Sequence, residues 1–239
     1  MPAKALIEVG GEPMLARVLH TLMACPQVGP VVVLGQDAEA LLSGRLAELG
    51  GHPRVSAVEA REGISASLSE VVGTERAPYP VLVTTADHPL LRPEFVSAFL
   101  AGAEGADAAF GVVDRWTVEA LHPGTKRTWI KFADGHWSGA NLFAFMNPRS
   151  RAATDFWAGV EHERKRALKL VARFGPAILL RTITRTISLS EAAQAAGRRF
   201  GVDVRAVPLP FAEAAIDVDK PSDLELAERI LAGRLSREA

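Results

Sequence analysis

The sequence has a single cysteine, almost no net charge and no long apolar run. Cys25 alone cannot form an internal disulfide or a cysteine-rich zinc site, which fits a reducing compartment. The 27 Lys and Arg residues balance 28 Asp and Glu residues, and the net charge of −1 offers no field that would attract nucleic acid. Because no stretch of about 18 apolar residues occurs, we expect no integral membrane segment.

The amino terminus also lacks the basic region, apolar stretch and small-residue cleavage site of a secretory signal. We therefore expect a soluble, cytoplasmic protein. Its 239 residues, of which 48% are hydrophobic, suffice to bury a sizeable core, and this length fits one α/β domain. The sequence leaves the oligomeric state open.

Strand and helix patterns alternate through the amino-terminal half. Apolar residues at helical spacing predict helices, and short β-branched runs between turn residues predict strands. The predicted helices are 14–23, 38–49, 65–72 and 93–101, and the predicted strands are 31–34, 55–58 and 81–85. This alternation predicts an α/β fold with a Rossmann-like, mainly parallel sheet and helices on both faces.

From residue 108 the pattern changes to short strands separated by polar or glycine-containing loops, which predicts a small antiparallel subregion. These strands are 108–113, 128–132 and 142–145. The later predicted elements are an amphipathic helix at 154–174, a segment ambiguous between helix and strand at 178–187, closing strands at 204–207 and 216–218, and a final helix at 224–231.

Two acidic clusters carry most of the chemical information. An apolar run ends in Asp87, the pattern of a buried strand that delivers an acid to the carboxyl edge of a sheet, where open α/β folds bind ligands. Asp217 and Asp219 are spaced by two, so on an extended segment they share a face, and Pro221 then ends the strand before a helix.

Carboxylates from the two clusters would together hold a divalent cation. A few hard oxygen ligands suit Mg²⁺, which keeps several waters and takes its other ligands from substrate phosphates. The pattern thereby indicates phosphate chemistry. The alternative is that each aspartate only caps the helix that follows it, and for either cluster alone this explanation is equally good. The presence of both clusters favours the metal.

Four segments of the sequence resemble a known family. They are KALIEVGGEPML at 4–15, EGISASL at 62–68, DHPL at 87–90 and DVDKPSDL at 217–224. In order and spacing they are similar to the corresponding segments of the MobA-like nucleotidyltransferases, which have a glycosyltransferase-A-like fold and are typified by molybdenum-cofactor guanylyltransferase. The likeness extends over nearly the whole chain.

The resemblance implies a reaction in which a phosphate of a small acceptor attacks the α-phosphorus of an NTP, so that NMP is transferred and pyrophosphate is released. It implies Mg²⁺ or Mn²⁺ held by Asp87 and Asp219, with Asp217 as a further ligand or as a residue that orients them. Lys4 matches the family's lysine and would bind the triphosphate. The expected catalytic residues are therefore Lys4, Asp87 and Asp219.

The same resemblance places further residues at the nucleotide and the acceptor. Gly63, Ser65 and Ser67 would lie beside the nucleotide, although a serine there could instead cap a helix. Gly139 and Asn141 match a substrate-contacting turn of the family.

A basic loop is a second candidate for the acceptor side. Lys126 and Arg127 follow a Pro-Gly turn and could bind the acceptor phosphate, for which arginine offers a bidentate fork. The alternative is that the two residues form an ordinary solvated turn.

One feature of the family has no counterpart before Lys4, namely its glycine-rich phosphate-binding loop. We expect either that this chain begins at an internal methionine or a truncation, or that it is a catalytically impaired nucleotide-binding relative; the intact acidic clusters favour the first. A metal-dependent NDP-sugar glycosyltransferase is another alternative, against which the segment around Lys4 argues. One nucleotidyltransferase domain is expected over 1–239, with a nucleotide-binding half at 1–105, an acceptor-binding half with inserted helices at 106–215, and a closing metal motif and helix at 216–239.

Overall fold

The computed structural model describes residues 3–61, 63–152 and 175–238. Its amino-terminal half contains β1 (Glu8–Val9), β2 (Glu12–Pro13), α1 (Met14–Ala24), β3 (Val31–Gly35), α2 (Ala38–Leu41), α3 (Ala47–Gly50), β4 (Val55–Glu59), α4 (Ile64–Val71), β5 (Val81–Thr84) and α5 (Pro93–Ala103). The remainder contains β6 (Ala108–Asp114), α6 (Arg115–Leu121), β7 (Ile130–Phe132), β8 (Gly135–Phe145), α9 (Pro176–Ile183), α10 (Leu189–Arg198), β9 (Val204–Pro208) and α11 (Pro221–Glu238). None of the helices in these ranges is long and apolar enough to cross a bilayer.

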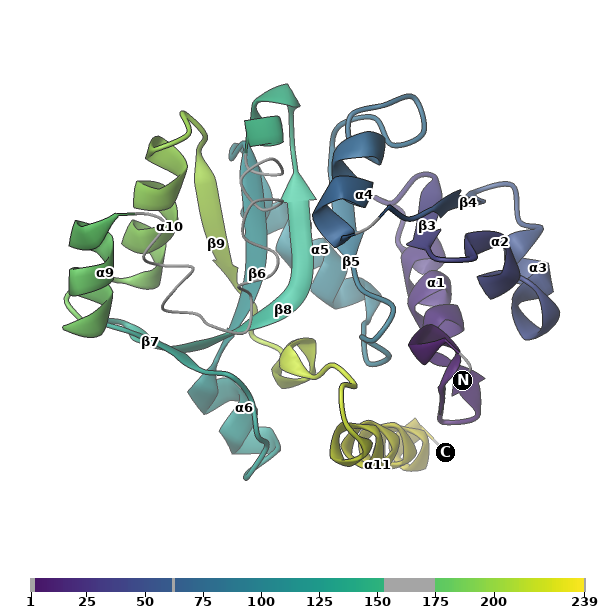
Figure 1. The fold of residues 1–239 in the computed structure, drawn as a ribbon. Coiled ribbons are helices and arrows are strands. Elements are labelled where there is room, and N and C mark those ends of the chain that lie inside the picture. The colour runs from purple at the N-terminus through teal and green to yellow at the C-terminus, as the bar shows by residue number, and fades with distance from the viewer. Residues whose placement is uncertain (1–2, 62, 153–174, 239) are drawn as a thin grey trace.

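The largest sheet is mixed, with the strand order β5-β8-β6-β9 and β7 paired to β8 (Figure 1). β5 and β6 both run antiparallel to β8, and β9 runs parallel to β6. Strands β5, β6 and β9 therefore point the same way, and their carboxyl ends share one edge of the sheet. Ligands of α/β sheets bind at such an edge. The predicted mixed α/β fold is confirmed.

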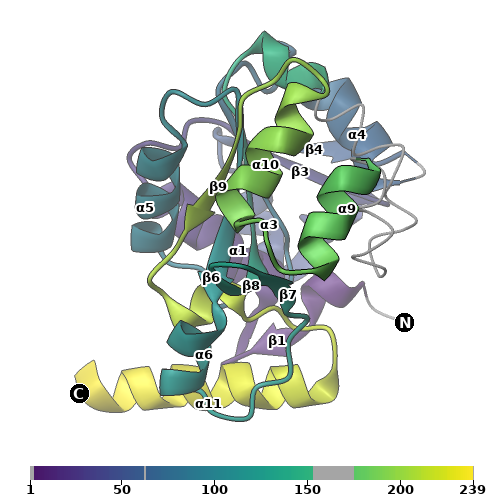
Figure 2. The ribbon, with the colours of Figure 1, turned by 90° about the vertical axis from the view of Figure 1, so that its left-hand side faces the viewer.

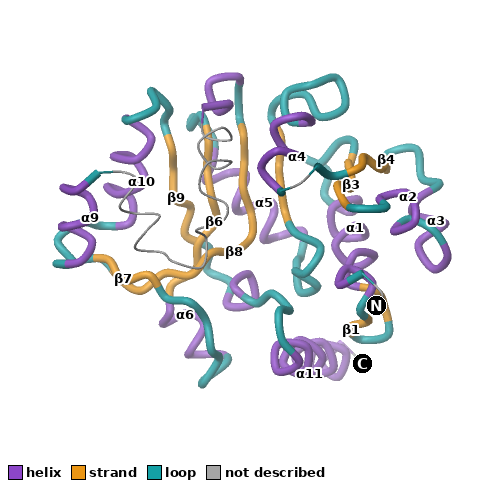
Figure 3. Tube along the Cα trace, in the orientation of Figure 1, coloured by secondary structure: helices purple, strands orange, loops and turns teal. Residues whose placement is uncertain are grey.

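Two smaller ladders and the helices complete the fold. β3 and β4 form a parallel pair, and β1 and β2 form a short hairpin. Figure 2 shows α5 and α4 on opposite sides of the large sheet, whereas Figure 3 shows α1, β3 and β4 at the end of the molecule opposite α9 and α10. One cluster of buried apolar residues from α1, β3, β4, α5, β6 and β8 joins the β3-β4 pair to the large sheet.

Strand β8 is longer than predicted because it continues past a β-bulge. Its register with β6 shifts between Phe110 and Val112. On the β8 side of this shift Asn141 has a φ of 49°, a left-handed conformation that asparagine tolerates better than most residues. Because a bulge bends its strand, the carboxyl part of β8 pairs with β5 while the amino part pairs with β7. The bend places Asn141 at the edge where β5 ends.

Two predicted elements differ from the structure, and a third, left open between helix and strand, is decided by it. The predicted helix 38–49 is broken, because Gly44 adopts a left-handed φ of 57° that a continuous helix cannot contain. The predicted strand 216–218 is wrong: in the described part of the chain this segment joins no sheet, and the Val218 N–H donates to the Asp87 carbonyl instead. The ambiguous segment 178–187 begins as helix α9. The predicted helix 154–174 lies outside the described residues.

The sequence analysis did not predict helices α6 and α10, although their caps are visible in the sequence. The side chain of Asp114 accepts a hydrogen bond from the Trp116 N–H and so begins α6. Ser188 and Glu191 form a complete capping box at the start of α10. Serine or aspartate followed by a glutamate three residues later is the signal that would have located α10.

Phe95 ties α5 to the chain that leads toward the second acidic cluster. Its side chain is fully buried, and its ring stacks on that of Phe211 with a centroid separation of 4.6 Å. Phe211 directly precedes the 3₁₀ turn Ala212–Ala215, which is followed by Asp217. The position of the second cluster therefore depends on packing in the main core.

We predict that Phe95→Ala lowers the free energy of unfolding by about 3–5 kcal/mol, the usual effect of removing a buried phenylalanine ring. Urea denaturation followed by circular dichroism measures this. Trp116→Ala is the control, because the side chain is 78% exposed and its loss should change stability by no more than about 0.5 kcal/mol. Equal losses in the two variants would contradict the assignment of Phe95 to the core.

Candidate active site

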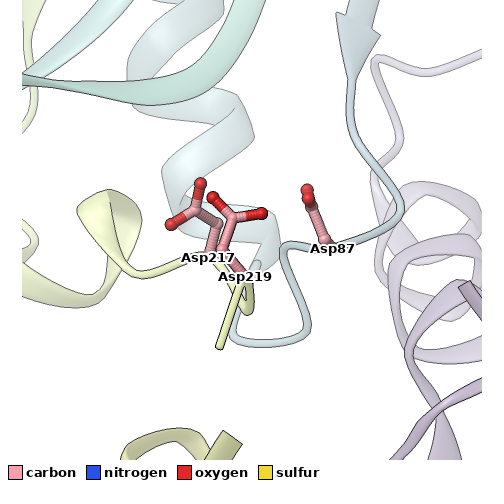
Figure 4. Close-up of side chains that lie close together, drawn as sticks. All are labelled: Asp87, Asp217 and Asp219. Atoms are coloured by element: carbon pink, nitrogen blue, oxygen red, sulfur yellow. The ribbon is translucent and has the colours of Figure 1, made fainter. Parts of the chain in front are cut away.

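Two loops bring the three aspartates of the acidic clusters together. Asp87 follows β5, and Asp217 and Asp219 follow the turn Ala212–Ala215. The Val218 N–H donates to the Asp87 carbonyl at 2.9 Å and holds the loops side by side. Figure 4 shows the three carboxylates pointing to the same side of these loops. One oxygen of each lies within 4.8 Å of the others.

The direction of these side chains follows from the alternation of residues 216–219. Ile216 and Val218 are 0% and 4% exposed and belong to a small apolar core with Leu90 of the other loop. Since side chains alternate on an extended segment, Asp217 and Asp219 face the opposite way. Burial of two apolar residues thus fixes the direction of two acids, as the spacing by two predicts.

Lys4 lies between the acids of the two clusters. Its Nζ donates to Asp87 Oδ2 at 2.6 Å and to Asp219 Oδ1 at 2.5 Å. Burial by itself lowers the pKa of the ammonium, but the hydrogen bonds to Asp219 and Asp87 outweigh it, and the pKa is raised. Lys4 is therefore charged at neutral pH and offsets the repulsion between the carboxylates. The structure brings the three predicted catalytic residues into direct contact.

Asp87 has a second carboxylate oxygen, which Lys4 does not contact. Its Oδ1 is buried and accepts no hydrogen bond within the described ranges of the chain. Such an oxygen is costly unless a cation or a water binds it. An all-carboxylate set of ligands suits Mg²⁺ or Mn²⁺ better than Zn²⁺. Asp87 and Asp219 therefore fit a divalent cation, at the place where the Lys4 ammonium lies.

Asp217 is already engaged by neighbouring side chains. One carboxylate oxygen accepts a hydrogen bond from Arg127 Nη1, and the other accepts one from Asn141 Nδ2 at 3.2 Å. These contacts favour the expectation that Asp217 orients the site over the expectation that it is a direct ligand. They also give Arg127 and Asn141 a partner within the protein, and the contact of these two residues with a substrate stays a prediction.

The other residues predicted for the acceptor are accessible. Lys126 is exposed at the loop between α6 and β7. Gly139 is exposed on β8, and a Cβ added there would meet nothing within 4 Å. Both residues are therefore accessible from solvent, and their contact with an acceptor stays a prediction.

The residues predicted at the nucleotide have local roles around the start of α4. Gly63 adopts a φ of 97° just before the helix. Ser67 is 4% exposed; its hydroxyl accepts a hydrogen bond from the Arg61 N–H and donates one to the Gly63 carbonyl, both at 2.9 Å. Ser67 therefore lies inside α4, holds the loop before the helix and does not cap it, and its contact with a nucleotide stays a prediction. The side chain of Ser65 lies outside the described part of the structure.

The sequence analysis assigned no role to Asp223, whose carboxylate holds the backbone of the loop that carries Asp219. Asp223 Oδ2 accepts hydrogen bonds from the N–H groups of Asp219 at 3.2 Å and Lys220 at 3.1 Å. An acid in the first turn after a helix-starting proline is the signal that could have identified it.

His88 is fully buried, and desolvation lowers its pKa to about 4, so the imidazole is neutral at pH 7.

Comparison with known proteins identifies the family. A sequence model of the MobA-like NTP transferase domain matches residues 2–142. The chain belongs to this family. The bifunctional protein GlmU of Anaeromyxobacter sp. (strain K) is 29% identical over 98% of the chain, which corresponds to 46% of GlmU. The chain thus spans about half the length of this curated relative.

Solved structures agree with this assignment. A hypothetical transferase from Thermus thermophilus is 32% identical and superposes with a TM-score of 0.75 over 92% of this MobA-like chain and 90% of its own. A CMP:2-keto-3-deoxy-manno-octonic acid synthetase solved with CTP superposes with a TM-score of 0.59 at 17% identity, over 98% and 93% of the two chains. At that identity the second likeness shows the nucleotidyltransferase fold alone.

We predict that Lys4→Met strengthens the binding of Mn²⁺ in the absence of nucleotide. The ammonium competes with a cation for Asp87 and Asp219, and relief of about 1.4 kcal/mol of competition corresponds to about tenfold in affinity. Electron paramagnetic resonance of free Mn²⁺ measures this. Lys220→Met removes a neighbouring exposed lysine and controls for the general change in charge. Equal effects of the two substitutions would contradict direct competition by Lys4.

Proposed function

We propose that the chain is a nucleotidyltransferase that uses a divalent cation, Mg²⁺ or Mn²⁺, to transfer NMP from an NTP to a small phosphorylated acceptor. The observation that carries this proposal is the contact of Lys4 with Asp87 and Asp219 at the carboxyl edge of the sheet. A cation-binding pair of acids and an accessible ammonium are the groups that a triphosphate requires. Membership of the MobA-like NTP transferase family supports the reaction class.

The chemistry to be supported is phosphoryl substitution between two anions. An oxygen of the acceptor phosphate forms a bond to the α-phosphorus, and the bond from this phosphorus to the bridging oxygen of the β-phosphate breaks. Pyrophosphate leaves with the electron pair of that bond. Catalysis of such a step consists mainly of alignment and of neutralising charge on the phosphates. When bound, the cation supplies part of that neutralisation.

The residues take distinct roles in this proposal. Asp87 and Asp219 hold the cation, and Asp217 orients the loop that carries Asp219. Lys4 turns from the acids to the triphosphate once a cation takes its place, as a mobile and strongly hydrated point charge is able to do. Its side chain is 43% exposed, so this movement meets no packed core.

The two halves of the chain divide the substrates between them. We assign residues 1–105 to the nucleotide and 106–215 to the acceptor, with 216–239 closing the site. The exposed Lys126 and the open surface at Gly139 support an acceptor on the second side. An NTP is thus expected near Lys4 and the loop at Gly63, and a phosphate of the acceptor near Lys126.

The first test is cation-dependent nucleotide binding followed by turnover. Wild-type protein is titrated with each of the four common NTPs with and without Mg²⁺, and the NTP that binds is then incubated with a panel of phosphorylated sugars and alcohols while pyrophosphate is measured. Mg²⁺-dependent binding of at least one NTP is expected. If none binds, or if binding is the same without Mg²⁺, the proposal is wrong.

Asp87→Asn and Asp219→Asn are each expected to lower the rate of pyrophosphate release by about 100-fold or more, the equivalent of roughly 2.7 kcal/mol of lost transition-state stabilisation. Each substitution preserves the size of the side chain and removes one charge. Glu48→Gln removes the carboxylate of an exposed residue in helix α3, away from the site, and serves as the control. Rates near wild type in either aspartate variant would exclude the proposed cation site.

Lys126→Met is expected to raise the KM for the acceptor about tenfold with little change in kcat, because it removes a ground-state contact to phosphate worth about 1.4 kcal/mol. Steady-state kinetics with varied acceptor measure this. The KM for the NTP in the same variant is the internal control. A rise in both KM values would place Lys126 at the nucleotide instead.

A further inference from the structure

The arginine predicted to bind the acceptor lies inside the protein. The Arg127 side chain is 8% exposed, whereas its neighbour Lys126 is exposed. Arg127 comes from the loop between α6 and β7 and contacts a segment 90 residues further along the chain. A group so deeply buried and paired to acids is poorly placed to meet a substrate phosphate.

The Arg127 guanidinium contacts three oxygen atoms of residues 217–223. Nη1 donates to Asp217 Oδ1, Nη2 donates to the Asp217 carbonyl oxygen at 3.0 Å, and Nη2 lies 3.6 Å from Asp223 Oδ1. The planar fork of arginine can reach a carboxylate and a carbonyl together, which the single ammonium of lysine cannot do in the same geometry. The contacts therefore depend on the shape of the side chain as well as on its charge.

The residues that Arg127 holds enclose Asp219. Asp217 lies two positions before it, and Asp223 accepts hydrogen bonds from the N–H groups of Asp219 and Lys220. Asn141 completes the arrangement through its hydrogen bond to Asp217 Oδ2 at 3.2 Å. The backbone around Asp219 is thus fixed on both sides, while its own carboxylate stays 61% exposed and faces Asp87 and Lys4.

We propose that Arg127 is a positioning residue, which fixes the segment from Asp217 to Asp223 and so sets the separation of the Asp87 and Asp219 carboxylates for a divalent cation. This inference rests on the proposed function. It assigns the two basic residues of one loop to different tasks: Lys126 faces the acceptor, and Arg127 acts through the acids.

Positioning and plain electrostatics predict opposite signs for the loss of Arg127. A fixed positive charge close to a cation site repels the cation, so removal of the charge alone would strengthen metal binding. Loss of a positioning residue would weaken it, because Asp219 would no longer be held at the distance that two ligands of one ion require. The sign of the change therefore decides between the two roles.

The experiment measures Mn²⁺ affinity of the full chain by electron paramagnetic resonance, with Mn²⁺ as the only added ligand. Arg127→Met is expected to weaken binding about tenfold. Arg127→Lys keeps the charge but loses the fork, and it is also expected to weaken binding. Arg181→Met removes an arginine of α9 from an exposed ion pair with Glu191 of α10 and should leave the affinity unchanged.

Kinetics with the same variants supply a second readout. Arg127→Lys should lower kcat and leave the KM for the acceptor near that of the wild type, the reverse of the pattern expected for Lys126→Met. Circular dichroism and thermal unfolding establish that each variant is folded. If Arg127→Met does not fold, Arg127→Lys carries the test by itself.

Two results with the Arg127 variants would overturn the inference. Binding of Mn²⁺ to Arg127→Lys as tightly as to wild type would show that only the charge matters, and tighter binding to Arg127→Met would show that Arg127 merely repels the ion. If wild type binds no Mn²⁺, or if Asp87→Asn does not weaken binding, the proposed function fails and the inference fails with it. If wild type binds Mn²⁺ and Arg127→Lys binds it equally tightly, the inference fails while the proposed function stands.

Discussion

Mutual repulsion of carboxylates is the constraint on which this structure depends. Asp87, Asp217 and Asp219 offer oxygens within 4.8 Å of one another, and Asp223 lies nearby in the first turn of α11. At such separations like charges destabilise the folded state unless cations lie between them. Two cations do so in different ways. Arg127 is buried against Asp217, whereas the Lys4 side chain is 43% exposed. In the function proposed above, the exposed Lys4 ammonium is the counter-ion that a metal would replace.

The fold brings these charges together through apolar packing and backbone hydrogen bonds. β5, β6 and β9 end at one edge because the first two are both antiparallel to β8 and the third is parallel to β6. Ile216, Val218 and Leu90 pack in one small core beneath the two loops, and the Val218 N–H bonds the Asp87 carbonyl. Burial of apolar side chains, which favours folding most strongly, thus offsets the cost of placing acids side by side.

Most of the fold could be predicted from local patterns, and the errors have identifiable causes. The helix at α1 and the strands at β3, β4 and β5 follow from apolar spacing, which is a property of short segments. The break at Gly44 was missed because helical spacing continues across it, although glycine adopts a left-handed φ there. The segment 216–218 has the alternation of a strand, but its one backbone contact to the first acidic loop replaces a ladder. Alternation reports which side chains are buried and does not report whether a neighbouring strand is present.

For the site, the sequence by itself determined the residue types: the acids at 87, 217 and 219, the lysine at 4, the shared face of Asp217 and Asp219, and the resemblance to the MobA-like family. Only the tertiary structure decided how these residues are partnered. The contacts of Ser67 with Gly63 and of Asp223 with the Asp219 backbone are local, and the sequence analysis missed them. The tertiary structure alone paired Arg127 and Asn141 with Asp217. The physical reason is distance along the chain. Periodicity and motifs describe neighbouring residues, whereas contacts across 76 to 90 positions arise from the packing of sheet, bulge and loops.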